Sequence, residues 1–204
     1  MGTIARFDLG EIITNTGVKA FVETGTLHGD GVLHALKYPF DEIHSIEIDE
    51  ELANNCTERF KGKDKVHIHE GHSGTVLPAL LESIKCNCLF WLDAHFPGAD
   101  CGKARYDAEP DYDLRLPLES EITAISERVG TYKDVMICDD AWVYEDGQFE
   151  WGTFNEHAAR HNHGITREDI NCGKDLSFLY DRFGDTHTFK KVTNDQGYIV
   201  VLPK

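Results

Sequence analysis

Apolar residues follow two different periods along the chain. Seven short runs rich in Val, Ile and Phe have the length of strands, at residues 20–23, 42–48, 65–70, 88–93, 134–140, 188–193 and 197–203. Between the first five runs, apolar positions recur every three or four residues, as in Leu118, Ile122 and Ile125. Strand followed by helix, repeated five times, predicts a mostly parallel sheet with helices on both faces, the Rossmann-like doubly wound arrangement.

The last two runs break this alternation. They are joined by Asn-Asp-Gln-Gly at residues 194–197, which suits a tight reversal, so an antiparallel hairpin is predicted at the edge of a seven-stranded sheet. No shift in composition marks a second unit, and residues 1–204 are expected to form a single domain. Residues 96–116 and 141–172 have no clear period. Both follow predicted strands, so we expect long loops over the carboxyl edge of the sheet, where open α/β folds bind ligands.

Composition narrows the classes of partner. The formal charge is -16, which disfavours nucleic acids and anionic membranes as partners. No apolar run reaches the roughly 18 residues of a membrane span, and no leader pattern opens the chain. Six cysteines in a chain of this length are expected to be reduced thiols, which favours a cytoplasmic protein. A homo-oligomer is compatible with these features.

The turn after the first strand is rich in glycine. The strand is expected to end at Glu23, and Gly25, Thr26, Gly29 and Gly31 follow within eight residues. Gly25 suits a tight turn, while Gly29 and Gly31 open the next helix, where bare backbone and free N–H groups could meet a ligand. The spacing differs from the G-x-G-x-x-G of dinucleotide-binding turns, which argues against a nicotinamide cofactor.

Two further strand ends extend this candidate site. Glu47 and Ile48 end the second strand, where an acid can accept both hydroxyls of a ribose. Gly71, His72 and Ser73 follow the third strand and lead directly into a helix. Together with the glycine-rich turn, they indicate a cofactor that contains adenosine.

In this order and spacing the chain resembles the class I S-adenosylmethionine-dependent methyltransferases, and within them the metal-dependent O-methyltransferases of the catechol and macrolide-sugar type. The resemblance covers residues 18–142 and consists of E-x-G-x-x-x-G from Glu23, the acid Glu47, and Gly71-x-Ser73 followed by Leu-Pro. It implies S-adenosylmethionine as the cofactor, with Glu47 on the ribose, His72 and Ser73 near the adenine, and the turn from Glu23 to Gly29 at the methionine part.

Acidic residues end the fourth and fifth strands. Asp93 ends the fourth, and Asp139 and Asp140 end the fifth, so three carboxylates should converge beside the cofactor turn. Such a cluster repels itself, and a hard dication such as Mg²⁺ would resolve the conflict by balancing the negative charges. A cation bound to the acceptor hydroxyl would also lower the pKa of that hydroxyl. The resembled enzymes carry their metal at the matching positions. Alternatively, these residues cap turns, as aspartates at strand ends commonly do.

His95 follows Asp93 by two residues and is a candidate general base with Asp93 beside it. The resembled enzymes often have Lys or Asp there, so His95 could also bind metal or cap a loop. Polar side chains in residues 96–116 suit a small hydroxyl acceptor such as a sugar or polyol. Trp142, Tyr144 and Trp151 could form a stacking wall or belong to the core.

Three other functions remain compatible with the pattern. One keeps the cofactor and omits the metal, with His95 alone as the base. Another is a non-catalytic module that binds the cofactor or a related nucleotide to regulate a partner protein. The third, on the fold alone, is a nicotinamide oxidoreductase.

Overall fold

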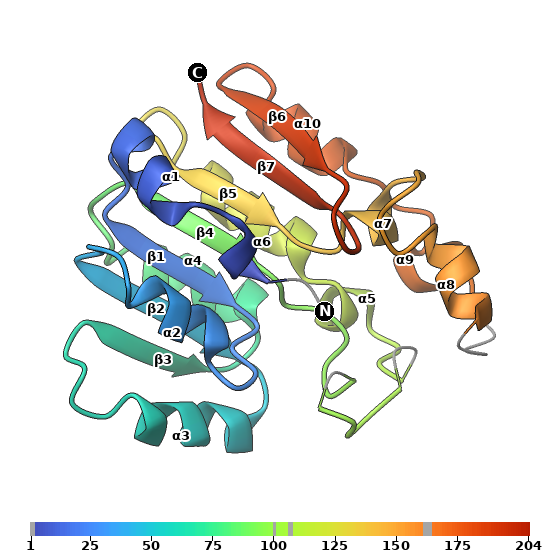
Figure 1. The fold of residues 1–204 in the computed structure, drawn as a ribbon, viewed down its shortest axis with the longest axis horizontal. Coiled ribbons are helices and arrows are strands. Elements are labelled where there is room, and N and C mark those ends of the chain that lie inside the picture. Colours follow the sequence, from blue (N-terminus) through green and yellow to red (C-terminus); the bar gives the residue numbers. More distant parts are fainter. Residues whose placement is uncertain (1–2, 100, 106–107, 161–164) are drawn as a thin grey trace.

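The computed structural model describes residues 3–99, 101–105, 108–160 and 165–204, and it confirms the predicted sheet (Figure 1). The strands occur in the order β3-β2-β1-β4-β5-β7-β6. The first five pair in parallel, while β7 is antiparallel to both β5 and β6. Their bounds are β1 Ala20–Thr24, β2 Glu42–Glu47, β3 Val66–Glu70, β4 Cys88–Leu92, β5 Val135–Cys138, β6 His187–Val192 and β7 Tyr198–Pro203.

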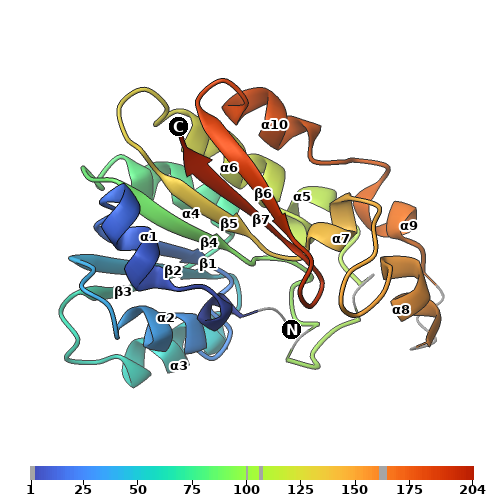
Figure 2. The same ribbon diagram turned by 45° about the horizontal axis from the view of Figure 1, so that its top comes forward.

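Helices cover both faces of the sheet, as the pattern predicts (Figure 2). One face packs against η1 Ile4–Arg6, α1 Leu9–Thr16, α2 Asp30–Ala35 and α3 Glu50–Arg59. The other face packs against α4 Ser73–Leu81, α6 Leu118–Ser126 and α10 Ser177–Phe183. Because successive strand residues point to opposite faces, Phe21 joins the first core and its neighbour Val22 joins the second.

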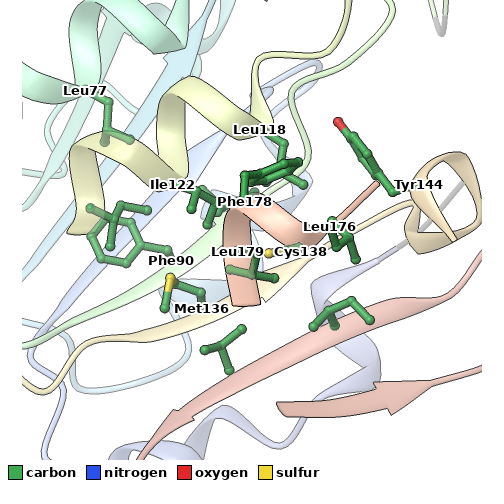
Figure 3. Close-up of a cluster of buried hydrophobic side chains, with 14 of the residues drawn as sticks. Leu77, Phe90, Leu118, Ile122, Met136, Cys138, Tyr144, Leu176, Phe178 and Leu179 are labelled. Carbon is green, nitrogen blue, oxygen red and sulfur yellow. The ribbon is translucent and has the colours of Figure 1, made fainter. Parts of the chain in front are cut away.

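The second core supports the carboxyl ends of β4 and β5. Ile122 on α6 and Leu179 on α10 are fully buried in one cluster with Phe90 and Met136 from these two strands (Figure 3). Burying each such side chain contributes about 1.5–3 kcal/mol to folding. The strand ends that carry the candidate acids are therefore supported by a closely packed apolar core.

The two long segments lie beyond the carboxyl ends of the parallel strands, as predicted, but they are not wholly irregular (Figures 1 and 2). Their described residues form four short helices, which are α5 Tyr112–Arg115, α7 Ala141–Tyr144, α8 Phe154–Arg160 and α9 Arg167–Asn171. Helices of four to seven residues are too short to show a period in the sequence. The expectation of plain loops is therefore wrong for these stretches.

A buried arginine joins the two segments. Arg115 donates from Nε and Nη2 to the carbonyl oxygen of Ile170 at 3.1 and 2.7 Å, and from Nη1 to that of Glu109 at 2.8 Å.

Trp142 and Tyr144 are each 4% exposed, so both belong to the core rather than to a stacking wall. All six cysteines are free thiols. No helix in the described ranges is long and apolar enough to cross a membrane.

Candidate active site

The turn after β1 packs directly against the end of β4. Gly25 has φ +83°, and a Cβ there would lie 2.6 Å from the carbonyl oxygen of Asp93. Only glycine allows both this left-handed conformation and this close approach. The turn thereby holds the backbone of Asp93 beside the first strand.

A pocket opens at the carboxyl ends of β1, β2, β3 and β4. Seven of the residues predicted for the site line it, namely Gly25, Glu47, Ile48, His72, Ser73, Asp93 and His95. Pro97, Gly98 and Cys101, from the first long segment, complete its wall. Strand ends far apart in sequence therefore meet around one space, as parallel pairing requires.

Glu47 is a buried acid of this pocket whose carboxylate is fixed by backbone hydrogen bonds. It is 6% exposed, and its carboxylate accepts the backbone N–H groups of Leu27 at 2.7 Å and Asp49 at 3.0 Å. Each carboxylate oxygen has two lone pairs, so both retain capacity for a ligand hydroxyl. The arrangement suits the ribose-binding role that the sequence predicts for this residue.

Four other predicted cofactor residues do not line the pocket: Glu23, Thr26, Gly29 and Gly31. Thr26 and Glu23 each form a 2.6 Å hydrogen bond with Ser45. A Cβ at Gly31 would collide with the Glu23 carboxylate, so this glycine makes room for an acid and not for a ligand. Burial raises the pKa of Glu23 to about 8.

Gly29 packs under α3 in the same way. Its φ is +80°, and a Cβ there would lie 2.6 Å from the ring of Phe60. The glycine-rich stretch is thus explained mainly by packing between the turn, β4 and α3.

The acids at the ends of β4 and β5 converge, as predicted, around His95. Its Nε2 lies 3.1 Å from Oδ2 of Asp140, and its Nδ1 lies 3.6 Å from Oδ1 of Asp93. Asp139 lies beside Asp93. Burial, and then the neighbouring Asp139, raises the pKa of Asp93 well above its usual range, and burial and Asp140 raise that of Asp139 to about 7.

The arrangement of these side chains does not fit a metal ion. Among the described residues, no three His, Cys, Asp or Glu side chains are grouped so that they could hold one together. The imidazole of His95 lies between Asp93 and Asp140, where a cation would otherwise balance both charges. The one feature that favours a cation is the pair of buried oxygens, Asp139 Oδ2 and Asp140 Oδ1, that lack hydrogen-bond partners.

Two of the five described non-glycine residues with positive φ lie next to His95. Phe96 has φ +47° and Asp140 has φ +53°, both in the left-handed region. A bulky residue such as Phe rarely adopts it, and such conformations cost of order 1–3 kcal/mol each. Strained backbone held by a rigid core is typical of functional sites.

Glu121 is an acid of this region that the sequence patterns did not reveal. It lies on α6 at 1% exposure, and burial raises its pKa to about 7 although the hydroxyls of Ser73 and Thr24 lower it. Neither hydroxyl completes a hydrogen bond of good geometry, since both oxygens and Glu121 Oε1 lack partners. Its position in the sequence could have indicated burial, because Glu121 shares the apolar helical face of Leu118 and Ile125.

The sequence matches no protein-family model and no curated protein. Solved structures do match. An O-methyltransferase from Bacillus cereus in complex with SAH has a TM-score of 0.56 at 15% identity, covering 96% of this chain and 79% of that one. The O-methyltransferase TomG from Streptomyces achromogenes, in complex with SAM, has a TM-score of 0.57 at 12% identity, covering 96% and 78%.

A third structure, the SAH-bound methyltransferase PaMTH1 from Podospora anserina, has a TM-score of 0.54 at 14% identity and covers 91% of this chain and 72% of its own. Identities this low establish the fold and not the activity. The chain therefore has the class I methyltransferase fold that the resemblance in its sequence implies.

Proposed function

We propose that this protein transfers a methyl group from S-adenosylmethionine to a hydroxyl of a small polar acceptor, such as a sugar or polyol, with His95 as the general base. The observation that carries the proposal is the placement of His95 and Asp93 in the wall of the same pocket as Glu47. An acid suited to a ribose and a base suited to an acceptor thus border one space.

The cofactor would bind along the strand ends that line this pocket. Glu47 would accept the ribose hydroxyls, and His72 and Ser73 would lie near the adenine. The methionine part would lie toward Gly25 and Asp93. The fold shared with structures that hold SAH or SAM supports this orientation.

The contacts of His95 support different roles for its two nitrogens. The 3.1 Å contact with Asp140 suits an Nε2–H donor, which leaves Nδ1 as the acceptor nitrogen of the neutral ring. Nδ1 would take the proton of the acceptor hydroxyl, and Asp93 and Asp140 would stabilise the imidazolium that forms. Bound S-adenosylmethionine would supply the methyl group to the deprotonated oxygen, with SAH as the product. Alignment of donor and acceptor can supply about 7–11 kcal/mol of the rate enhancement.

A divalent cation is the second candidate, because Asp139 and Asp140 each leave one buried oxygen without a partner. Mg²⁺ prefers oxygen ligands of this type, but His95 would have to move from between Asp93 and Asp140 before a cation could bind there.

Methyl transfer from labelled S-adenosylmethionine, measured across a panel of sugars, polyols and catechols, tests both candidates. The first predicts transfer in EDTA and a large loss in His95→Gln. Transfer that requires added Mg²⁺ would support the second. SAH binding without transfer to any acceptor would instead favour a regulatory cofactor-binding module.

A further inference from the structure

A second, smaller cavity lies beside the cofactor pocket and shares two lining residues with it. Ala94 and His95 border both spaces. The second cavity continues between β4, β5, α6 and α7, away from the residues expected to hold the cofactor. A group bound in it would therefore be next to the proposed base.

Three acids line this cavity, and each is deeply buried. Glu121, Asp139 and Asp140 are 1%, 4% and 5% exposed. Each leaves one carboxylate oxygen with no hydrogen-bond partner: Glu121 Oε1, Asp139 Oδ2 and Asp140 Oδ1. Buried polar atoms are rarely left unpaired, because each unpaired acceptor costs about 1–3 kcal/mol.

The chain itself supplies little positive charge to balance these acids. Among the described residues, no Lys or Arg side chain lines the cavity, and His95 is its one basic member. Three acids that line one space, each with an oxygen that lacks a partner, suit a group with several donors and a positive charge. A primary ammonium has three N–H donors and forms charge-assisted hydrogen bonds with carboxylates.

Size and polarity restrict the ligand further. The cavity holds about 10 Å³ of free space, close to the roughly 10–15 Å³ that one water-sized group needs. An ammonium head has about that size, whereas a ring or a trimethylated nitrogen is too large. Leu92, Leu116 and Val143 form an apolar wall suited to the carbon that carries the nitrogen.

Resting on the function proposed above, we propose that the methyl acceptor carries a primary ammonium group, which Glu121, Asp139 and Asp140 bind in this cavity while a hydroxyl of the same molecule faces His95. Amino alcohols and amino sugars are the matching class. The same acids repel phosphorylated or carboxylated acceptors, and the net charge of -16 adds to that repulsion. The ammonium, held protonated by carboxylates, anchors the acceptor and leaves the hydroxyl as the nucleophile.

Thermal unfolding in salts of graded cation size tests this site without knowledge of the acceptor. Methylammonium chloride should raise the melting temperature by about 3–6 °C at ten times its dissociation constant, above sodium chloride or tetramethylammonium chloride at equal ionic strength. Glu121→Gln should abolish the difference. Glu127→Gln is the matched control, since it makes the same change at an exposed position at the end of α6.

Equal responses to all three salts, or a methylammonium response that survives Glu121→Gln, would overturn the proposal. A response to Mg²⁺ with none to methylammonium would also overturn it and assign the acids to a metal. Comparison of the salts on the unmodified protein decides the question even if Glu121→Gln does not fold. The salts are tested without SAH, so the two hypotheses can fail separately. If SAH binds but methylammonium has no effect, only the ammonium site is contradicted. If methylammonium stabilises the protein but SAH does not bind, only the cofactor proposal is contradicted.

Discussion

His95 Nε2 lies 3.1 Å from Asp140 Oδ2, and this contact joins the segments that follow β4 and β5. The backbone of Asp140 is left-handed at φ +53°, which directs its side chain in a way that ordinary strand geometry would not. The ring is thereby held beside Asp93, with one nitrogen committed to Asp140. A base fixed in one orientation is what proton removal in a methyl transfer requires.

Replacement of His95 should remove the chemistry and keep the binding. His95→Gln is expected to lower kcat about 10²–10⁴-fold, the usual contribution of a general base, because the imidazole that contacts both Asp93 and Asp140 is lost. SAH affinity, measured by calorimetry, should change less than threefold. A variant that retains full kcat would show that another group takes the proton.

Replacement of Glu47 should weaken cofactor binding. Glu47→Gln is expected to weaken SAH binding about 10–100-fold, since a hydrogen bond to a charged group contributes about 1.5–3 kcal/mol. Glu50→Gln, an exposed change three residues along the chain, is the control. Equal affinities for the two variants would place the ribose elsewhere.

Gly25 and Gly62 form a matched pair for testing the cofactor turn. Their φ angles are +83° and +80°, but a Cβ at Gly62 meets nothing within 4 Å, whereas one at Gly25 meets the Asp93 carbonyl at 2.6 Å. Gly62→Ala should lower the free energy of unfolding by about 1–2 kcal/mol, the cost of the left-handed conformation. Gly25→Ala should lower it by more and also weaken SAH binding. Urea denaturation measures the first effect, and equal losses would contradict the packing described here.

Glu23 should make stability depend on pH. Burial raises its pKa from 4.5 to about 8 in the folded protein, so the folded state keeps a proton that the unfolded chain has released. The stabilisation is complete below pH 4.5 and is lost as the pH rises to about 8, with a magnitude of order 3–5 kcal/mol. Glu23→Gln should remove the contribution of this residue, while Glu121 and Asp139, whose pKa burial raises to about 7, keep theirs. Urea denaturation at pH 5, 7 and 9 measures it, and parallel profiles for both proteins would contradict the assignment.

Much of the fold is predictable from the sequence because strand and helix periods alternate without interruption. The convergence of Asp93 with Asp139 and Asp140 follows from the pairing of neighbouring parallel strands. The sequence pattern did not predict Glu121 as a site residue, because one acid on a helical face rich in Leu and Ile does not change the apolar period of that face. The short helices of residues 141–172 depend on tertiary contacts, such as the burial of Trp142, that no local period records.

The roles of the individual glycines also cannot be predicted from the sequence. A glycine for ligand approach and one for packing look alike in a pattern. Only the neighbours in space show that Gly31 faces Glu23 and that Gly25 faces Asp93.

The central claim, that the pocket beside Glu47 binds this cofactor, is tested most directly by thermal unfolding during titration with SAH, with and without Mg²⁺. A ligand that binds only the folded state raises the melting temperature with its concentration. The account predicts such a rise in EDTA, and its loss in Glu47→Gln at the same SAH concentrations. A melting temperature that stays constant across the titration in both conditions would contradict it.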